Sequence, residues 1–493
     1  MLPYKPEPGT PGDLAIDNPA PLGELAAIVN DRNIAVAMAP DGHVLLVRPD
    51  SALVEVPVSP DRNNAVANLV DRYDATLART IREGIVDKDV TFLKINFNGE
   101  QAPPRFGPEF RWSVSKVNEF LREAASTRDA DGNPTPVHAE YNHVVIGAQT
   151  VRGSPLGVSA SWAGEMAFIG EITQTKQGRP VMLTTADPSV PPAVLRDPLD
   201  IKGHRTPRVL VLDTGLRTVP VRTGGGRTVE HEELQRCHVH TNWLVDGTPG
   251  LVDDEDEELD PPVGPIPTGT RPPANPDQVL DFEAGHGTFI AGIVRQLCPD
   301  AEICSAGVLS SFGDGDVDGV TSNLKRVLAE IDGPVDIVVM SFGTNLIGDD
   351  PGFFGEELTR LLGDAVGVAA AGNQSTCRPY FPAALPNVIG VGGLAADGKA
   401  WFTNFGGWVD ACAPAVDVVS TFFNDFQEVI DGQQKRHYEQ WARWSGTSFS
   451  APKVAAVIAQ EMYLNQVTAK EAWKRVTSHK HLRYPDLGIV FNV

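Results

Sequence analysis

The sequence is poor in the features that mark several large classes of protein. Among 493 residues there are only 5 cysteines, an odd number with no C-x-x-C pair, so neither a disulfide framework nor a zinc knuckle is indicated. No run approaches the roughly 20 apolar residues that cross a membrane. The 41 lysines and arginines are outnumbered by 64 aspartates and glutamates, and a chain of net charge -23 lacks the basic face that nucleic acid requires. We therefore expect neither a membrane nor a nucleic acid as a partner.

The first residues also lack a secretory signal. The opening stretch MLPYKPEPGTPGDLAIDNPAP has no basic segment followed by the roughly 7–15 apolar residues typical of such a signal. On this basis we expect a cytoplasmic protein whose cysteines are buried or free thiols.

What the chain does contain is the composition of a globular protein. Hydrophobic residues make up 42% of it, and its length suggests two or three domains. A proline-rich polar stretch at 184–208 without sustained periodicity predicts a linker between domains. The predicted division is therefore an N-terminal domain at 1–183 and a second domain at 209–493.

The N-terminal domain shows a mixed pattern of helices and strands. Short strands are expected within 34–58, and strands again at 90–97 and 141–149. A helix is expected at 113–126 and another at 64–85. The second rests on one apolar stripe made of Val66, Val70, Tyr73, Leu77 and Ile81. The pattern predicts a small α+β domain, and it carries no catalytic motif that we can name.

After the linker, short apolar strands alternate with helices. This alternation predicts an α/β fold whose mostly parallel sheet is covered by helices on both faces. In such sheets the active groups gather at the carboxyl ends of the strands. Three residues at element ends therefore need an explanation.

The three residues are an aspartate, a histidine and a serine. Asp213 ends the apolar run VLVLD, His286 lies between two glycines, and Ser448 stands before a helix-like run. Taken singly, each has an ordinary structural interpretation as a turn former, a helix-start residue or a helix N-cap. As a set they supply a carboxylate to orient, an imidazole to take a proton and a hydroxyl to attack. Asn373, which follows another apolar strand, adds an amide that can donate to an oxyanion.

Residues 208–460 resemble the subtilisin-like serine proteases. The resemblance rests on the motifs DTG, GHGTFIAG, AAGNQ and SGTSFSAP, and the chain order Asp, His, Ser agrees with it. It implies a serine endopeptidase acting on proteins or peptides. Ser448 would be the nucleophile, His286 the general base and Asp213 its orienting carboxylate, with Asn373 and the Ser448 backbone N–H as oxyanion donors.

The resemblance also implies a place for the substrate. Two edges of the cleft would sandwich an extended peptide strand through main-chain bonds. Tyr380 stands where the family has a pocket-floor glycine, which predicts a shallow pocket for small side chains next to the cut bond. Asp314 and Asp316 suggest an attraction to basic residues upstream of the cut, with a solvated loop as the plainer interpretation. The residues of the two edges are Gly313, Asp314, Gly315, Ser341, Phe342 and Gly343.

Two long segments depart from the family pattern. The insertion at about 224–284 carries an acidic run at 253–260, and a second segment spans 422–444. Either could gate the site or be a surface decoration. Many family members bind structural calcium, but the EF-hand-like DGDVDG fails because Lys325 stands where a bidentate glutamate is needed. We expect no cofactor and leave calcium unassigned to any residue.

The role of the N-terminal domain is open between two interpretations. It is either a propeptide that folds and inhibits the catalytic domain, or a permanent regulatory domain that binds a partner protein. A further alternative is a catalytically idle scaffold that binds peptides without cutting them. An esterase is disfavoured, because no G-x-S-x-G elbow surrounds the serine.

Overall fold

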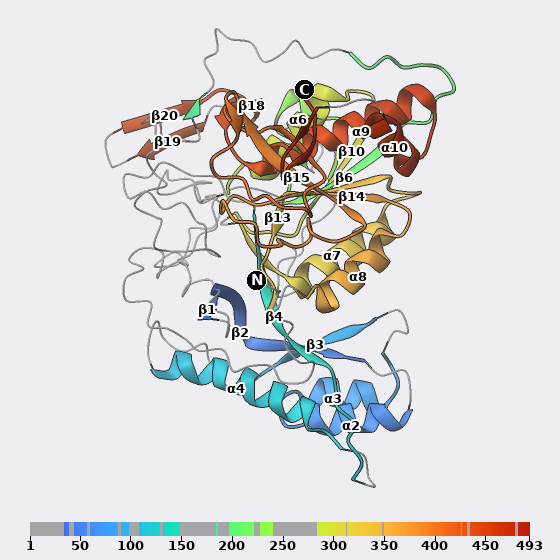
Figure 1. Ribbon diagram of the computed structural model, residues 1–493, viewed down its shortest axis with the longest axis vertical. Helices are drawn as coiled ribbons and strands as arrows, with labels where there is room; N and C mark the ends of the chain where they lie inside the picture. The colour runs from blue at the N-terminus through green and yellow to red at the C-terminus, as the bar shows by residue number, and fades with distance from the viewer. Residues whose placement is uncertain are drawn as a thin grey trace.

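The described residues form an N-terminal part and a second part, and strands of both parts pair in one of the sheets (Figure 1). The computed structural model describes residues 34–38, 44–56, 60–86, 90–97, 108–128, 132–147, 184–185, 197–220, 227–239, 283–311, 313–347, 350–424, 426–430, 434–478 and 482–493.

The N-terminal part is an antiparallel sheet with helices packed on it. Strand β4 pairs with β2. The first part of β2 also pairs with β1, and its last part pairs with β3. A buried apolar cluster fills the space between this sheet and the helices. The elements are β1 (Ala35–Met38), β2 (Val44–Glu55), α2 (Pro60–Val70), α3 (Ala75–Arg82), β3 (Phe92–Asn96), α4 (Pro108–Ala125) and β4 (Ala139–Gly147).

The predicted single helix at 64–85 is wrong, because the structure has two. Helix α2 ends at Val70 and α3 starts after Asp74, whose side chain accepts a hydrogen bond from the N–H of Leu77. An aspartate N-cap satisfies the first turn of a new helix, so the apolar stripe continues while the backbone turns. The predicted helix at 113–126 begins earlier, at Pro108.

The main sheet confirms the prediction of a mostly parallel α/β architecture. Eight strands in the order β9, β10, β6, β12, β14, β15, β17, β23 pair in parallel, while β16 and β22 are antiparallel additions. The strands are β6 (Arg208–Asp213), β9 (His238–Val239), β10 (Glu302–Gly307), β12 (Ile337–Met340), β14 (Val366–Ala370), β15 (Val388–Ala395), β16 (Gly398–Lys399), β17 (Ala411–Pro414), β22 (Arg483–Tyr484) and β23 (Gly488–Val490).

Helices cover both faces of this sheet. Alternate residues of a strand point to opposite faces, so Val209 and Val211 of β6 face one apolar cluster and Leu210 and Leu212 face another. The first cluster lies under α6 (His286–Leu297), α9 (Ala451–Asn465) and α10 (Ala469–Ser478). The second lies under α7 (Val317–Glu330) and α8 (Gly352–Leu362), the two helices that face the N-terminal part in Figure 1.

Short elements complete the second part. The segment 422–444 contains a hairpin of β19 with β20, followed by β21, which pairs with β18 and β5. The elements are β5 (Thr184–Thr185), β7 (Thr218–Pro220), β8 (Arg227–Val229), η2 (Glu232–Leu234), β11 (Asp314–Asp316), β13 (Phe342–Gly343), β18 (Val418–Thr421), β19 (Phe426–Ile430), β20 (Gln434–Tyr438), β21 (Trp441–Trp444) and η4 (Thr447–Phe449).

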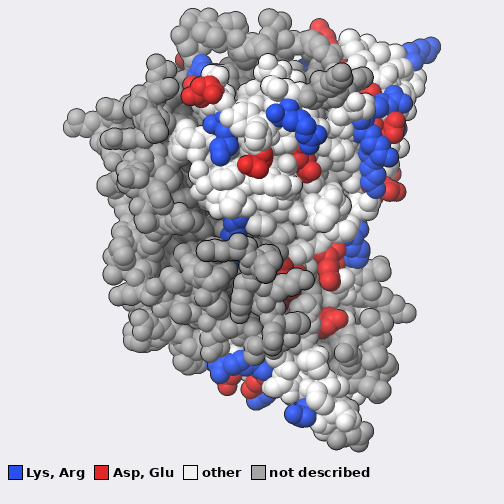
Figure 2. Space-filling model, viewed as in Figure 1, with Lys and Arg blue, Asp and Glu red and all other residues white. Residues whose placement is uncertain are grey.

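The described part of the predicted linker is anchored on the second part of the chain. The N–H of Leu199 donates to Asp300, and that of Ile201 to the hydroxyl of Tyr463. All five cysteines are free thiols. None of the helices in the described ranges is long and apolar enough to cross a membrane. On the described area of the face in Figure 2, acidic and basic side chains are interspersed.

Candidate active site

The first pair of the candidate site is an aspartate and a histidine held in direct contact. Asp213 is the last residue of β6 and His286 the first residue of α6. Nδ1 of His286 lies 2.7 Å from Oδ1 of Asp213, and both side chains are fully buried. The same Oδ1 accepts a hydrogen bond of 2.9 Å from the N–H of Thr214. A carboxylate held in this way fixes both the tautomer and the orientation of the imidazole.

The glycines around His286 allow a close approach of backbones. A Cβ at Gly287 would lie 2.2 Å from the carbonyl oxygen of Gly215, so only glycine fits where α6 meets the end of β6. Gly285 has a φ of +81° and packs against the ring of Phe422. Both positions beside His286 therefore require glycine.

Ser448 lies in the turn η4, immediately before α9. Its backbone is tied to the strand edge after β12, because the hydroxyl of Ser341 donates to the carbonyl of Ser448 at 2.9 Å. In return the Ser448 hydroxyl lies 3.5 Å from the carbonyl of Ser341. Phe449, the next residue, packs its ring 5.4 Å from the ring of His286. The turn that carries the serine thus contacts the helix that carries the histidine.

Asn373 follows β14, and its side-chain oxygen accepts hydrogen bonds from η4. The N–H and the hydroxyl of Thr447 both donate to Oδ1 of Asn373, at 3.0 and 2.8 Å. Since a backbone N–H can only donate, the atom that accepts it is the oxygen, and the amide nitrogen points elsewhere. The hydroxyl of Thr447 also accepts from the N–H of Gly372 at 3.1 Å.

Strand β4 of the N-terminal part lies between the two edges that the sequence singled out for substrate. On one side it pairs antiparallel with β11, Val145 opposite Gly315. On the other it pairs antiparallel with β13, Ile146 opposite Gly343. The N–H of Gly147 donates to the carbonyl of Gly313 at 2.7 Å. An extended strand held on both sides is the geometry of peptide recognition by β-strand addition.

Two acidic residues of β11 meet a buried arginine of the N-terminal part. Nε of Arg48 lies 3.1 Å from Asp316, and Nη2 lies 3.1 Å from Asp314. Burial alone would raise the pKa of Asp316, but the charge of Arg48, supported by Lys94, holds that pKa below its usual value. The solvated-loop interpretation of these aspartates is therefore wrong, since both side chains are buried and ion-paired.

Tyr380 fills the space beside the second edge. It is buried, and its ring occupies the place that a side chain at Gly343 or Gly372 would need. Burial raises the pKa of the Tyr380 hydroxyl, which is hydrogen-bonded to Gln374. A large ring at this point leaves little room between the segments around Gly343 and Gly372.

Two residues of the site carried no signal in the sequence. Glu283 is buried three residues before His286, and its Oε2 lies 3.4 Å from Nε2 of the imidazole. Trp444, also buried, packs its ring edge-to-face against His286 at 5.6 Å. Neither belongs to a motif, because the contacts arise from segments brought together only by folding.

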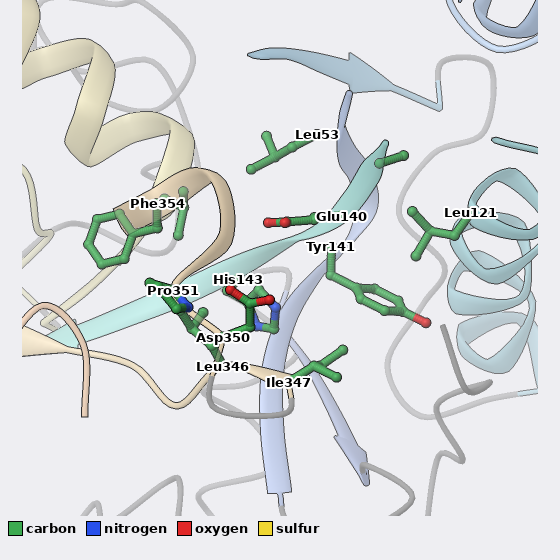
Figure 3. Close-up of a pocket in the computed structure, with 12 residues that line it drawn as sticks. Leu53, Leu121, Glu140, Tyr141, His143, Leu346, Ile347, Asp350, Pro351 and Phe354 are labelled. Atoms are coloured by element: carbon green, nitrogen blue, oxygen red, sulfur yellow. The ribbon is translucent and has the colours of Figure 1, made fainter. Parts of the chain in front are cut away.

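A separate pocket of about 170 Å³ lies where β4 faces residues 346–347 and 350–354 (Figure 3). On the β4 side it is lined by Glu140, Tyr141 and His143, and on the other by residues that include Asp350 and Phe354. His143 is buried, and this burial lowers its pKa to about 4. The pocket is thus part of the contact between the two parts of the chain, away from Asp213 and His286.

No metal centre is found in the described ranges, where no three His, Cys, Asp or Glu side chains gather to hold an ion. The acidic run at 253–260 lies outside those ranges, and so does most of the insertion that carries it.

Comparison with known proteins gives one family and several relatives. The model of the subtilase family, peptidase S8, matches residues 209–487. The thermophilic serine proteinase of Bacillus sp. (strain AK1) is 29% identical over 194 residues, which are 35% of this chain and 41% of that protein. Alkaline elastase YaB of Bacillus sp. (strain YaB) is 27% identical over 212 residues, 40% of this chain and 49% of that protein. The chain therefore spans less than half the length of these two relatives.

Among solved structures, the crystal structure of a cold adapted subtilisin-like serine proteinase is similar. It shares 23% sequence identity with a TM-score of 0.38, and the match covers 55% of this chain and 81% of that one.

Proposed function

The chain belongs to the subtilase family, and on this premise we propose that it is a serine endopeptidase that cuts peptide bonds in proteins or peptides. The observation that carries the proposal is the 2.7 Å contact between Asp213 and His286 at the carboxyl edge of the parallel sheet. Helix α6 and the turn with Ser448 meet at the same edge. These are the parts that acyl transfer by a serine requires.

In the proposed mechanism Ser448 attacks the carbonyl carbon of the scissile bond. His286 takes the hydroxyl proton through Nε2 and returns it to the leaving amine as the C–N bond breaks. Asp213 stabilises the charged imidazole through Nδ1. The amide of Asn373, which Thr447 orients, and the backbone N–H of Ser448 hold the oxyanion. Water then repeats the sequence and releases the acyl group.

We propose further that the N-terminal domain keeps this peptidase idle by occupying its cleft. Strand β4 pairs with β11 and β13, as a bound peptide would. Ion pairs from Arg48 to Asp314 and Asp316, and apolar contacts of Leu53, Phe92 and Val145 with α7 and α8, support a docked inhibitor. We also propose that the protein is cytoplasmic and that a partner protein releases the domain.

The idle scaffold is the second candidate, and the filled cleft is the observation that favours it. A chain that never releases β4 would hold its own strand in the cleft and would cut no peptide.

The test compares the full chain with its Ser448→Ala variant. Both are incubated and followed by intact mass, and both are offered an unfolded protein such as casein. We expect the wild type alone to lose its N-terminal domain and then to cut casein. If both proteins stay intact and neither cuts casein, including after limited digestion of the N-terminal domain by an added protease, the scaffold is the better description.

A further inference from the structure

Glu283 is a buried carboxylate to which the proposed mechanism assigns no step. Its backbone is held at both ends: its N–H donates to the carbonyl of Ser311, and its carbonyl accepts from the N–H of His286. The side chain is 1% exposed and points toward the cleft, with Oε2 3.4 Å from Nε2 of His286. Its position is therefore fixed by the same turn that presents the histidine.

The side chain of Glu283 lies where a peptide in the cleft would extend one of its own side chains. A Cβ built on Gly147 of β4 would lie 3.3 Å from Cδ and 3.6 Å from Oε1 of Glu283. On the other flank, a Cβ on Gly313 would lie 2.3 Å from Cγ of Glu283. The carboxylate therefore forms the wall beside the position that Gly147 occupies, and Gly313 is small enough to let it reach there.

We propose that Glu283 is a specificity-determining residue that selects lysine or arginine at the substrate position which Gly147 occupies. This rests on the proposed function, because it concerns which peptides that same cleft cuts. A carboxylate withdrawn from water is stabilised by a cation that reaches it, and hydrogen bonds between charged groups are the stronger ones. A neutral side chain at the same position adds no such interaction, and an acidic one repels the carboxylate.

The glycine of β4 agrees with this assignment. Gly147 of β4 places no side chain of its own against Glu283, so this residue makes main-chain contacts in the cleft without the contact that we assign to specificity. A substrate with a basic side chain here gains an interaction that the internal strand lacks. Glu283 has to move by only a few tenths of an ångström to admit the first carbon of that side chain.

The test uses peptides built on the chain's own sequence VVIGAQT (144–150), with the glycine replaced by lysine, norleucine or glutamate. Norleucine has the length of lysine without its charge, so the lysine-to-norleucine ratio of kcat/KM measures the charge alone. With the processed wild-type enzyme we expect lysine to be preferred by roughly 10- to 100-fold, and glutamate to be the poorest. In Glu283→Gln the ratio falls toward one, while the preferences at other positions stay.

The role of Glu283 and the peptidase activity can fail separately. Cutting of the lysine and norleucine peptides at equal rates by the wild type overturns the role of Glu283 and leaves the peptidase proposal standing. Persistence of the lysine preference in Glu283→Gln does the same. If no peptide is cut, the peptidase proposal fails and takes this one with it. If Glu283→Gln binds but does not cut, the same ratio is read from the dissociation constants of the peptides, against those of Ser448→Ala.

Discussion

The N–H of Gly147 donates to the carbonyl of Gly313 across 2.7 Å, and on its other side Gly147 pairs with Phe342. The end of β4 is thus held by both edges of the cleft at once. The residue before Phe342 is Ser341, whose carbonyl lies 3.5 Å from the hydroxyl of Ser448. The strand therefore runs toward the candidate nucleophile.

The first prediction concerns where the chain cuts itself. In an antiparallel pairing, the residue after Gly147 is expected opposite the residue before Phe342, which is Ser341. Because the hydroxyl of Ser448 lies beside the carbonyl of Ser341, we expect the cut after Ala148. Intact mass and N-terminal sequencing of the processed wild type should give a new end at Gln149. The Ser448→Ala variant is the control and should stay whole. A first cut inside the predicted linker at 184–208 would contradict this register.

The second prediction concerns the side chain next to the cut. Tyr380 packs against Gly343 and Gly372, so peptides with alanine or glycine before the scissile bond should be cut at least about tenfold faster than those with phenylalanine. Tyr380→Ala should narrow or reverse this ratio, whereas Tyr380→Phe should keep it. Removing a buried ring costs about 3–5 kcal/mol, so the melting temperature is measured beside the ratio. An unchanged ratio in a folded Tyr380→Ala enzyme would contradict the prediction.

The third prediction concerns the oxyanion donor. Asn373→Ala should lower kcat by roughly 10²–10³ with little change in KM, because the lost hydrogen bond matters most in the transition state. Thr447→Val removes one of the two donors that fix the Asn373 oxygen, so it should give a smaller fall in kcat. Steady-state kinetics on one peptide measure both. Equal losses in kcat and rises in KM would point to substrate binding instead.

The fourth prediction concerns the docking of the N-terminal domain. Arg48→Met leaves Asp314 and Asp316 buried without their cation, and breaking a buried ion pair costs about 3–5 kcal/mol. We expect the variant to show more peptidase activity before processing than the wild type. The matched control is Arg72→Met, which removes a largely exposed ion pair with Glu123 on the same domain and should change little. Equal activity of the two variants would argue against an inhibitory docked state.

The fifth prediction concerns pH and His143. Its pKa is lowered by burial to about 4, below the ordinary value near 6.5, so the docked state holds the neutral ring. Its contribution to stability is complete above pH 6.5 and is lost as the pH falls toward 4. By pH 5 the loss is at most about 2 kcal/mol.

Denaturation of Ser448→Ala at pH 8 and pH 5 measures this loss, and an added His143→Gln substitution should shrink the difference. His231, in the other part of the chain, has its pKa lowered in the same direction to about 4, so His231→Gln is the comparison that shows how much of the effect is local. Full retention of the pH effect in His143→Gln would assign it elsewhere.

How far the sequence predicted the structure depended on whether a feature was local. Strand–helix alternation predicted the parallel sheet, because each buried strand leaves its own apolar run. The stripe from Val66 to Ile81 was recognised but taken as one helix, because a period of apolar residues continues across a turn. Asp74 was the available signal, since an aspartate before ATLARTIR is a typical N-cap.

The parts of the site that could not be predicted come from long-range contacts. Glu283 looks like an ordinary acidic residue of a loop until Gly147, more than a hundred residues earlier, lies against it. Arg48 and its two aspartates are still farther apart in sequence, by 266 and 268 residues. Motifs with fixed local geometry indicated Asp213, His286 and Ser448, whereas burial and charge pairing between domains leave no short pattern.

Because β4 shares a sheet with β11 and β13, the release of the N-terminal domain depends on whether the chain is cut. While β4 is tethered to β6 by the same chain, its local concentration at the cleft is on the order of millimolar, whatever the amount of protein present. A free peptide must compete against that concentration. One cut in the tether turns an intramolecular equilibrium into a bimolecular one, and dilution then favours departure although not one contact of the interface has been weakened. After the cut, the fraction of enzyme with an empty cleft depends on the protein concentration relative to the dissociation constant of the docked domain, so dilution alone makes the cleft available to other strands.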